Sequence, residues 1–238
     1  FKNIDNSNLK AVASLQEKKR ELFKDQFKLK EKNVFSNYDE VINHPDIDIV
    51  YIGLPNSMHE TYCFKSLDSN KHVLVEKPIT KNIKTFRELK RLSVKKKLLL
   101  EEGTANKFHP FYNKILNEMK KLNFSKVVKI ESSFGNDALG GKKIFGFSLK
   151  KVNYKKRLFN KDLDGGSILD GGIYPISLLL DIIEIFNDTF EESVITKSEK
   201  KISKNIDLES SLTLAFRNVE IEIKTSLTKN LDNNFIIY

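Results

Sequence analysis

Lys77 is the residue whose position in the sequence most favours a catalytic role. It follows the apolar run His72–Val75 and stands directly before Pro78. A lysine just beyond a buried strand lies at a cleft, where it can donate to a substrate hydroxyl and where partial burial would lower the pKa of its ammonium toward a useful range. A surface lysine in a tight turn explains the same spacing equally well.

A second segment, residues 164–175, sets four glycines around Asp170 and Tyr174. If these two residues lie in the first turn of a helix, their spacing of four places them on one face. A carboxylate and a phenol on one face could bind a diol and transfer a proton. A glycine loop in which Asp170 caps the following helix is the commoner arrangement and stays open.

Polar residues or turn formers follow three successive predicted strands, as Gly53-Leu54-Pro55-Asn56 with His59 beyond it, Glu76-Lys77-Pro78, and Glu101-Glu102-Gly103. In an open parallel sheet, ligands bind beyond the carboxyl ends of the strands. Three such ends together form a stronger signal than any one alone.

Histidine and cysteine give weaker signals. His59 and His109 could be catalytic, but a lone histidine near a helix start is more often structural. The four histidines lack metal-ligand spacing, so no metal site is predicted. Cys63 lies in the middle of a predicted helix and is expected in the core.

The first half of the chain alternates apolar strands with amphipathic helices. Strands are predicted at residues 9–14, 48–53, 72–75 and 98–101, and helices at 17–27, 38–42, 57–69 and 83–96. This alternation predicts βαβ units and a doubly wound parallel sheet. The strand at 48–53 is expected to be buried on both faces.

The second half has a different pattern. Helices are predicted at 111–122 and 173–186, and strands that alternate apolar with polar residues at 126–134, 194–198, 210–216 and 219–225, with a Gly- and Lys-rich loop up to about Asp164. Alternation is typical of antiparallel strands with one polar face. We therefore expect two domains, residues 1–104 and 105–238, the second of the α+β class.

Composition narrows the choice of function. The 238 residues are 39% hydrophobic, with one cysteine and a formal net charge of +9. No run is long enough for a membrane span and no secretory leader is recognisable, so a cytoplasmic protein is expected. Nucleic-acid binding is one interpretation of the charge, but a lysine-rich surface is favoured because the basic runs lack interleaved aromatic residues.

The segments at residues 46–59, 71–78, 102–110 and 165–174 resemble, in this order, motifs of the glucose-fructose oxidoreductase / inositol dehydrogenase / rhizopine catabolism (Gfo/Idh/MocA) family. The resemblance implies a Rossmann domain followed by an α/β domain whose open sheet often forms homo-oligomers. It implies NAD or NADP as cofactor and a sugar, cyclitol or diol as substrate. Lys77 would match the active-site lysine, Asp170 the substrate-orienting aspartate, and Tyr174 a position that is histidine or tyrosine.

The residues implied at the cofactor are Ser14, Leu54, Pro55, Asn56, His59, Glu76, Lys77, Pro78 and Lys107. The sequence also departs from the family pattern. It contains no glycine-rich phosphate loop, so the first βαβ unit of the sheet is expected to be missing and the chain truncated at the N-terminus and at the C-terminus. Lys107 stands where many members have arginine. Ser14 stands where NAD-specific members place an acid, which leans toward NADP because Lys18 and Lys19 are close by.

The expected function is hydride transfer between a nicotinamide cofactor and a secondary hydroxyl or carbonyl of the substrate. A non-catalytic binding or regulatory protein on the same scaffold is the alternative. Neither a nucleic acid nor a membrane is expected as a partner. Substrate specificity is expected to depend on the loop from Gly135 to Lys161.

Overall fold

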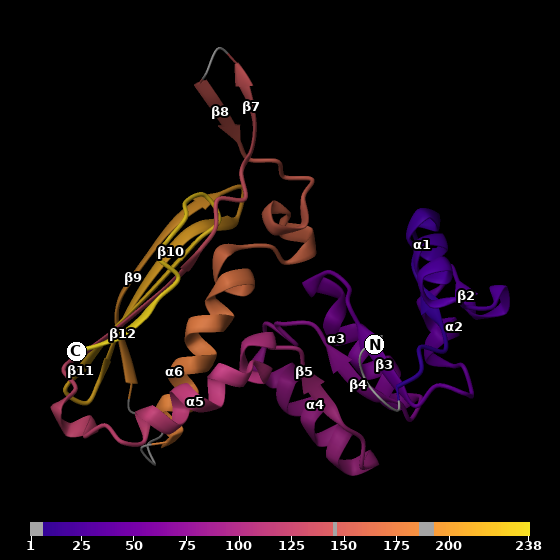
Figure 1. The fold of residues 1–238 in the computed structure, drawn as a ribbon, viewed down its shortest axis with the longest axis horizontal. Coiled ribbons are helices and arrows are strands. Elements are labelled where there is room, and N and C mark those ends of the chain that lie inside the picture. Colours follow the sequence, from indigo (N-terminus) through magenta and orange to yellow (C-terminus); the bar gives the residue numbers. More distant parts are fainter. Residues whose placement is uncertain (1–6, 145–146, 186–192) are drawn as a thin grey trace. The chain divides into compact units, whose positions relative to one another are not determined.

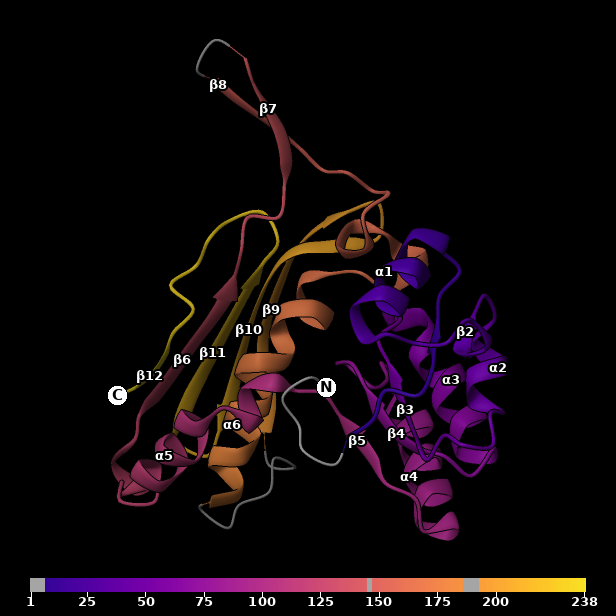
Figure 2. The same ribbon diagram turned by 45° about the vertical axis from the view of Figure 1, so that its right-hand side comes forward.

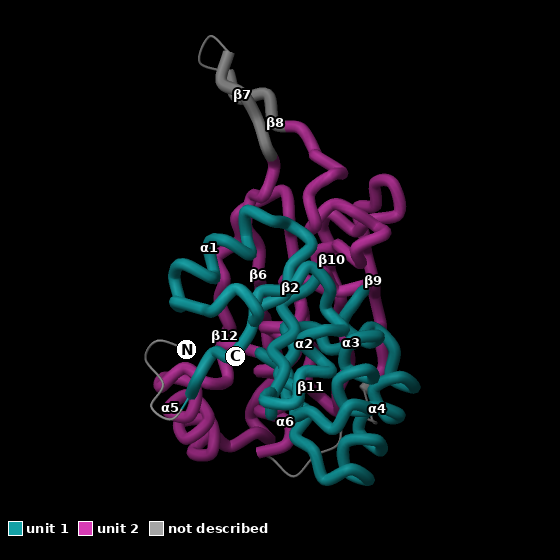
Figure 3. The backbone as a smooth tube through the Cα atoms, turned by 90° about the vertical axis from the view of Figure 1, so that its right-hand side faces the viewer, with its two compact units in different colours: residues 1–54, 58–103 teal, residues 55–57, 104–238 magenta. Residues whose placement is uncertain are grey.

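The computed structural model describes residues 7–144, 147–185 and 193–238, without the side chains of residues 140–150. The chain forms two compact units, coloured separately in Figure 3. The first comprises residues 1–54 and 58–103, and the second comprises residues 55–57 and 104–238.

The first unit is an α/β structure with parallel strands, as predicted. Its elements are β1 (Val12–Ala13), α1 (Glu17–Phe27), β2 (Val34–Phe35), α2 (Tyr38–Ile42), β3 (Ile49–Ile52), α3 (Asn56–Asp68), β4 (His72–Val75), α4 (Ile83–Lys96) and β5 (Leu100–Glu102). Strands β3, β4 and β5 form one parallel sheet in that order, and β1 pairs with β2 in a second parallel ladder. Because β3 and β5 both run parallel to β4, all three strands end at the same edge of the sheet.

Local signals set the helix ends. The Oδ1 atoms of Asn37 and Asn82 accept the backbone N–H of Asp39 and Lys84, each at 2.9 Å, and so begin α2 and α4. Helices α1 and α4 end where Lys28 and Lys97 adopt left-handed backbone angles. The predictions for α1, α2, α4 and β4 are confirmed, and α3 begins at Asn56 rather than beyond Ser57.

The helices of this unit turn their apolar side chains into one buried core. Cys63 and Leu67 of α3, Leu89 of α4, and Val73 and Val75 of β4 are all fully buried in one cluster. Cys63 is thus a core residue, as expected, and burial raises the pKa of its thiol to about 12. The thiol stays protonated at neutral pH and behaves as a small apolar group.

One prediction for this unit is wrong. Strand β3 is buried on one face only, because Val50 and Ile52 enter the core while Ile49 and Tyr51 remain 48% and 47% exposed. A continuous apolar run predicts two covered faces, but the side chains of Ile49 and Tyr51 stay about half exposed. The sequence pattern reports side-chain type, whereas burial also requires a neighbour.

The second unit is an α+β structure. Its elements are α5 (Pro110–Met119), β6 (Lys129–Gly135), β7 (Gly140–Ile144), β8 (Phe147–Lys151), α6 (Ile173–Ile185), β9 (Ser193–Ser203), β10 (Ile206–Phe216), β11 (Val219–Ser226) and β12 (Phe235–Ile237). The sheet order is β12-β6-β11-β10-β9, antiparallel except for the parallel pair β6–β11.

Helix α6 lies along one face of this five-stranded sheet (Figures 1 and 2). Leu179 and Ile183 of α6 pack against Ile130, Phe216 and Ile221 of the sheet. The alternation of apolar and polar residues predicted this one-sided burial, and the mainly antiparallel sheet is confirmed.

The predicted loop before Asp164 is wrong in part. Strands β7 and β8 form an antiparallel ladder in which Gly140 pairs with Lys151 and Ile144 with Phe147. Gly and Lys are depleted in strands, so propensity pointed to a loop, and pairing between two adjacent segments prevailed over it. Among the described residues, no helix is long and apolar enough to cross a membrane.

Glu209 of β10 joins three segments of the second unit. Its Oε1 accepts from Lys201 Nζ at 3.0 Å and from the Thr228 hydroxyl at 2.6 Å, and its Oε2 accepts from Lys229 Nζ at 2.6 Å. Burial alone would raise the pKa of Glu209, but hydrogen bonds from Lys229, Thr228 and Lys201 outweigh it and lower the pKa to about 2.

Glu209→Gln should lower the free energy of unfolding by about 1 kcal/mol at pH 7. Since the carboxyl titrates near 4.5 when unfolded and near 2 when folded, the difference from wild type is complete above pH 4.5 and lost as the pH falls toward 2. Urea unfolding at both ends of that range measures it. Glu199→Gln, at a side chain that is 65% exposed, is the control and should be neutral; equal losses in both variants would contradict the interpretation.

Candidate active site

The turn that carries Lys77 is held by side chains from the elements on either side of it. Lys77 itself is half-buried at the carboxyl end of β4, and its bond to Pro78 is cis. Glu102, at the end of β5, accepts the backbone N–H of Ile79 through Oε1 at 2.7 Å. The Thr80 hydroxyl donates to the carboxylate of Glu60 in α3. The turn therefore has fixed partners on both neighbouring elements.

His59 makes the most enclosed of these contacts. The ring is 0% exposed, with Nδ1 2.8 Å from Pro78 O and Nε2 2.8 Å from Leu54 O. Both partners are carbonyl oxygens, so a ring protonated on both nitrogens satisfies both contacts and a neutral ring satisfies one. His59 thus connects the turn after β3 with the turn after β4. The structural role that the sequence favoured is the one observed, and a contact with a cofactor stays a prediction.

Glu76 lies beside Lys77 and takes a different partner. Tyr51 of β3 donates its hydroxyl to Glu76 Oε1 at 2.8 Å. Burial, the hydrogen bond to Glu76 and the charge of that carboxylate raise the pKa of Tyr51 to about 12. The phenol therefore remains a donor at neutral pH and holds the Glu76 carboxylate toward β3.

Ser14 follows β1, at the position where the family resemblance implies a residue that contacts the cofactor ribose. Its hydroxyl accepts the backbone N–H of Gln16 at 3.2 Å. Arg20 of α1, half-buried, donates through Nη1 to the Ser14 carbonyl at 2.7 Å. The structure therefore adds a guanidinium beside Ser14. The sequence suggests Lys18 and Lys19 as the cations near Ser14, but Arg20, the next residue of α1, is the one that contacts it.

In the second unit, Asp170 lies in a π-helical turn, Ile168–Gly172, that runs into α6. The assumption that Asp170 and Tyr174 occupy the first α-helical turn is therefore wrong, because a π turn holds more residues per revolution. Asp170 is also not the helix cap, since Ser167 holds that position. Arg157 Nη2 donates to Asp170 Oδ1 at 3.0 Å and fixes the direction of the carboxylate.

Tyr174 lies in the first turn of α6 and is half-buried. Its ring packs against Phe134 of β6, with centroids 4.7 Å apart and planes tilted by 40°. A Cβ atom at Gly171 would lie 2.9 Å from the Phe134 ring, so this glycine leaves the space that Phe134 occupies. Phe134 was not predicted, because its role depends on a strand that is distant in sequence.

Lys107 is paired within the second unit. Its Nζ lies 2.7 Å from Asp181 Oδ1, and the Tyr112 hydroxyl donates to Asp181 Oδ2 at 2.7 Å. Burial and the hydrogen bond to Asp181 raise the pKa of Tyr112. A carboxylate shared in this way directs the ammonium toward α6. The predicted role of Lys107 at a cofactor remains a prediction.

Pro55, Asn56 and His109 are the remaining residues that the sequence singled out. Pro55 and Asn56 belong to the second unit, where Asn56 Nδ2 donates to the backbone oxygen of Asp164 at 2.9 Å. His109 caps α5, since its Nδ1 accepts the Phe111 N–H at 3.3 Å. No group of metal-binding side chains occurs among the described residues.

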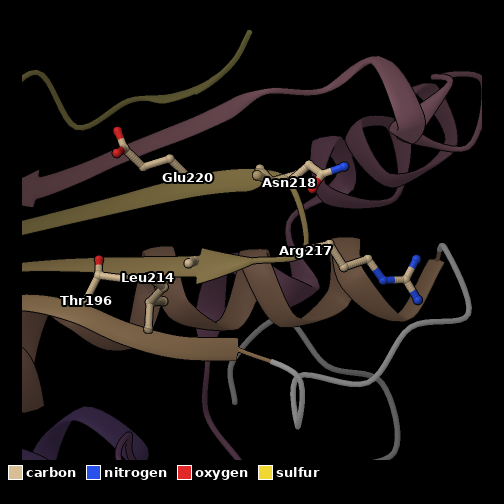
Figure 4. Close-up of a pocket in the computed structure, with 7 residues that line it drawn as sticks. Thr196, Leu214, Arg217, Asn218 and Glu220 are labelled. Carbon is tan, nitrogen blue, oxygen red and sulfur yellow. The ribbon is translucent and has the colours of Figure 1, made fainter.

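The second unit also has a surface hollow. Arg217, Asn218 and Glu220 line it at the turn between β10 and β11 (Figure 4). Its lining contains none of the predicted site residues.

Known proteins resemble this chain in sequence and in fold. Residues 1–104 match the Gfo/Idh/MocA family model, described as an oxidoreductase family with an NAD-binding Rossmann fold. Residues 1–104 are thus similar to the NAD-binding Rossmann domain of this family. Trans-1,2-dihydrobenzene-1,2-diol dehydrogenase of Xenopus tropicalis is 29% identical over 165 residues, which are 68% of this chain and 44% of that protein. D-xylose 1-dehydrogenase (NADP(+)) of Hypocrea jecorina is 26% identical, over 76% of this chain and 46% of that protein.

Solved structures share the fold of this chain. An aldose-aldose oxidoreductase from Caulobacter crescentus has a TM-score of 0.80 at 20% identity, covering 99% of this chain and 68% of its own. A 3-ketoreductase from Actinomadura kijaniata, in complex with TDP-benzene and NADP, has a TM-score of 0.77 at 20% identity, covering 95% and 64%. The chain spans less than half the length of these two curated relatives.

His59→Ala should lower the free energy of unfolding by about 3 kcal/mol. The substitution removes the buried ring that contacts the carbonyl oxygens of Pro78 and Leu54. His109→Ala is the matched control and should lower it by about 1 kcal/mol, since only a helix cap is lost. Urea unfolding of both variants measures the difference. Similar small losses would show that the contacts of His59 do not stabilise the two turns.

Proposed function

We propose that this chain contributes the substrate side and part of the cofactor side of an NAD(P)-dependent oxidoreductase acting on a secondary hydroxyl or carbonyl of a sugar or diol. The observation that carries the proposal is the Lys77 turn, a lysine at a strand end held by His59, Glu102 and Glu60. Fixed positioning of this kind is what proton transfer in a transition state requires.

The residues of the chain fit a dinucleotide at the strand ends. Half-buried Arg20 and Lys77 place positive charge beyond β1 and β4, and the turn at residues 53–56 brings backbone to the same edge as the Lys77 turn. When bound, a nicotinamide would supply the hydride acceptor or donor.

The protein's own groups would handle the proton. Lys77 would polarise the reacting oxygen as charge develops on it, and Tyr174 or Lys77 would give or take the hydroxyl proton. Asp170, directed by Arg157, would orient the substrate hydroxyl as an acceptor. Phe134 would limit the orientations of the Tyr174 ring.

NADP is the favoured cofactor in this proposal. The position after β1 carries Ser14 instead of a carboxylate, and the guanidinium of Arg20 lies against it. An arginine at this place suits a 2′-phosphate, whereas an acid suits the 2′-hydroxyl of NAD. The NADP named for the xylose dehydrogenase and for the 3-ketoreductase complex gives further support.

Lys77→Ala in the complete protein should lower kcat at least about 100-fold on an established substrate, the loss expected for removal of a general acid–base group. Lys84→Ala, on the exposed surface of α4, is the control and should leave kcat unchanged. Unchanged turnover in Lys77→Ala, after titration of folded protein, would overturn the assignment. Cofactor binding without turnover across a polyol panel would favour a non-catalytic protein.

Arg20→Ala should lower the ratio of kcat/KM for NADP to that for NAD about tenfold, because a charge-assisted contact with the 2′-phosphate is lost. Arg87→Ala, on the exposed side of α4, should leave the ratio unchanged. Steady-state kinetics with both cofactors provides the measurement. If the two variants keep the same ratio, Arg20 does not discriminate between the cofactors.

A further inference from the structure

Asp207 of β10 lies directly behind the turn that carries Asp170. We propose that Asp207 is a positioning residue, which fixes the start of that turn and so directs the Asp170 carboxylate. The inference rests on the proposed function only in the role given to Asp170. Its structural part depends on contacts within the second unit alone.

Asp207 accepts hydrogen bonds from three groups through one oxygen. Its Oδ2 lies 2.7 Å from Ser167 Oγ, 2.9 Å from the Ile168 backbone nitrogen and 3.1 Å from Ser210 Oγ. The Ile168 N–H belongs to the first residue of the π turn, where helical N–H groups have no partner within the helix. The Asp207 carboxylate, from strand β10, therefore caps the start of the π turn.

One assignment of the hydroxyl hydrogens gives Asp207 all of its donors. Ser167 Oγ also lies 2.9 Å from Thr225 Oγ1, and each hydroxyl has a single hydrogen to give. If Ser167 donates to Asp207, then Thr225 donates to Ser167, and Ser210 donates to Asp207. This network connects β10, β11 and the turn, and Ser167, Ser210 and Thr225 are at most 8% exposed. An ionised acceptor at its end makes the hydrogen bonds stronger than those between neutral groups.

Two adjacent glycines make the approach possible. Gly166 has φ +129°, and a Cβ atom there would collide with Asp207 Oδ1. A Cβ atom at Gly165 would lie 2.5 Å from the backbone oxygen of Leu158 and 2.7 Å from that of Arg157. Gly166 thus admits Asp207, and Gly165 admits the segment that carries Arg157.

Asp170 is held through both approaches. Its backbone N–H donates to Gly166 O at 3.1 Å, so the position of Asp170 follows that of the Gly166 peptide beside Asp207. Its carboxylate receives Arg157 Nη2 at 3.0 Å, from the segment beside Gly165. Loss of the Asp207 contacts would release the first of these two constraints and leave the second. The carboxylate would then keep its contact with Arg157 but lose the fixed backbone position from which it is directed.

The test compares Asp207→Ala, Asp207→Asn and Glu209→Gln. Asp207→Ala should lower kcat about 100-fold, as expected when a reacting group is displaced by about 1 Å, with the KM for the cofactor unchanged. Asp207→Asn keeps the shape and one acceptor and should recover most of that loss. Glu209→Gln breaks the neighbouring surface cluster on the same strand, so it controls for lost stability and should keep kcat.

Amide hydrogen exchange of Ile168 and Asp170 gives a readout that does not need turnover. Both amides should exchange faster in Asp207→Ala than in wild type or in Glu209→Gln, while β11 keeps its protection. Unchanged exchange would overturn the inference. So would faster exchange with wild-type kcat in Asp207→Ala when Asp170→Asn is impaired. If Asp170→Asn and Lys77→Ala both keep full activity while exchange increases, the proposed function fails and the structural role of Asp207 stands.

Discussion

Backbone groups that leave a buried strand must find a hydrogen-bond partner, and the candidate site depends on how this constraint is met. After β4 the chain can no longer continue the ladder, and the carbonyl of Pro78 and the N–H of Ile79 enter a partly buried turn. Side chains supply the partners, with His59 at Pro78 and Glu102 at Ile79. Because these side chains come from α3 and β5, the turn is as rigid as the elements around it.

The second unit meets the same constraint at the start of α6. There the orphan N–H is that of Ile168, and the partner is the carboxylate of Asp207. In each unit the residue proposed for catalysis, Lys77 or Asp170, lies in a turn whose backbone is held by other side chains. The side chains that hold each turn therefore differ from the side chain that is proposed to react.

The sequence predicted the elements better than the contacts. Alternation, helix caps and buried runs located α1, α2, α4, β4 and α6, because those signals are local. They failed where the outcome depends on a distant neighbour: the exposed face of β3, the pairing of β7 with β8, and the π turn at Ile168–Gly172. The site shows the same division, since Lys77 and Asp170 could be proposed from their positions. Arg157, Asp207 and Phe134 become relevant only once strands that are distant in sequence are adjacent.

The glycines around Asp170 have unequal consequences for sequence change. Side chains at Gly165 or Gly166 would meet a backbone oxygen or a carboxylate that cannot move without disturbing the turn, whereas a methyl group at Gly172 would meet only ordinary contacts of 3.5 Å or more. A drifting sequence can therefore replace Gly172 by alanine and keep this turn, but it can replace the first pair only if β10 or the Arg157 segment changes at the same time. A segment that looks uniformly glycine-rich thus combines one tolerant position, Gly172, with three whose replacement depends on other parts of the chain.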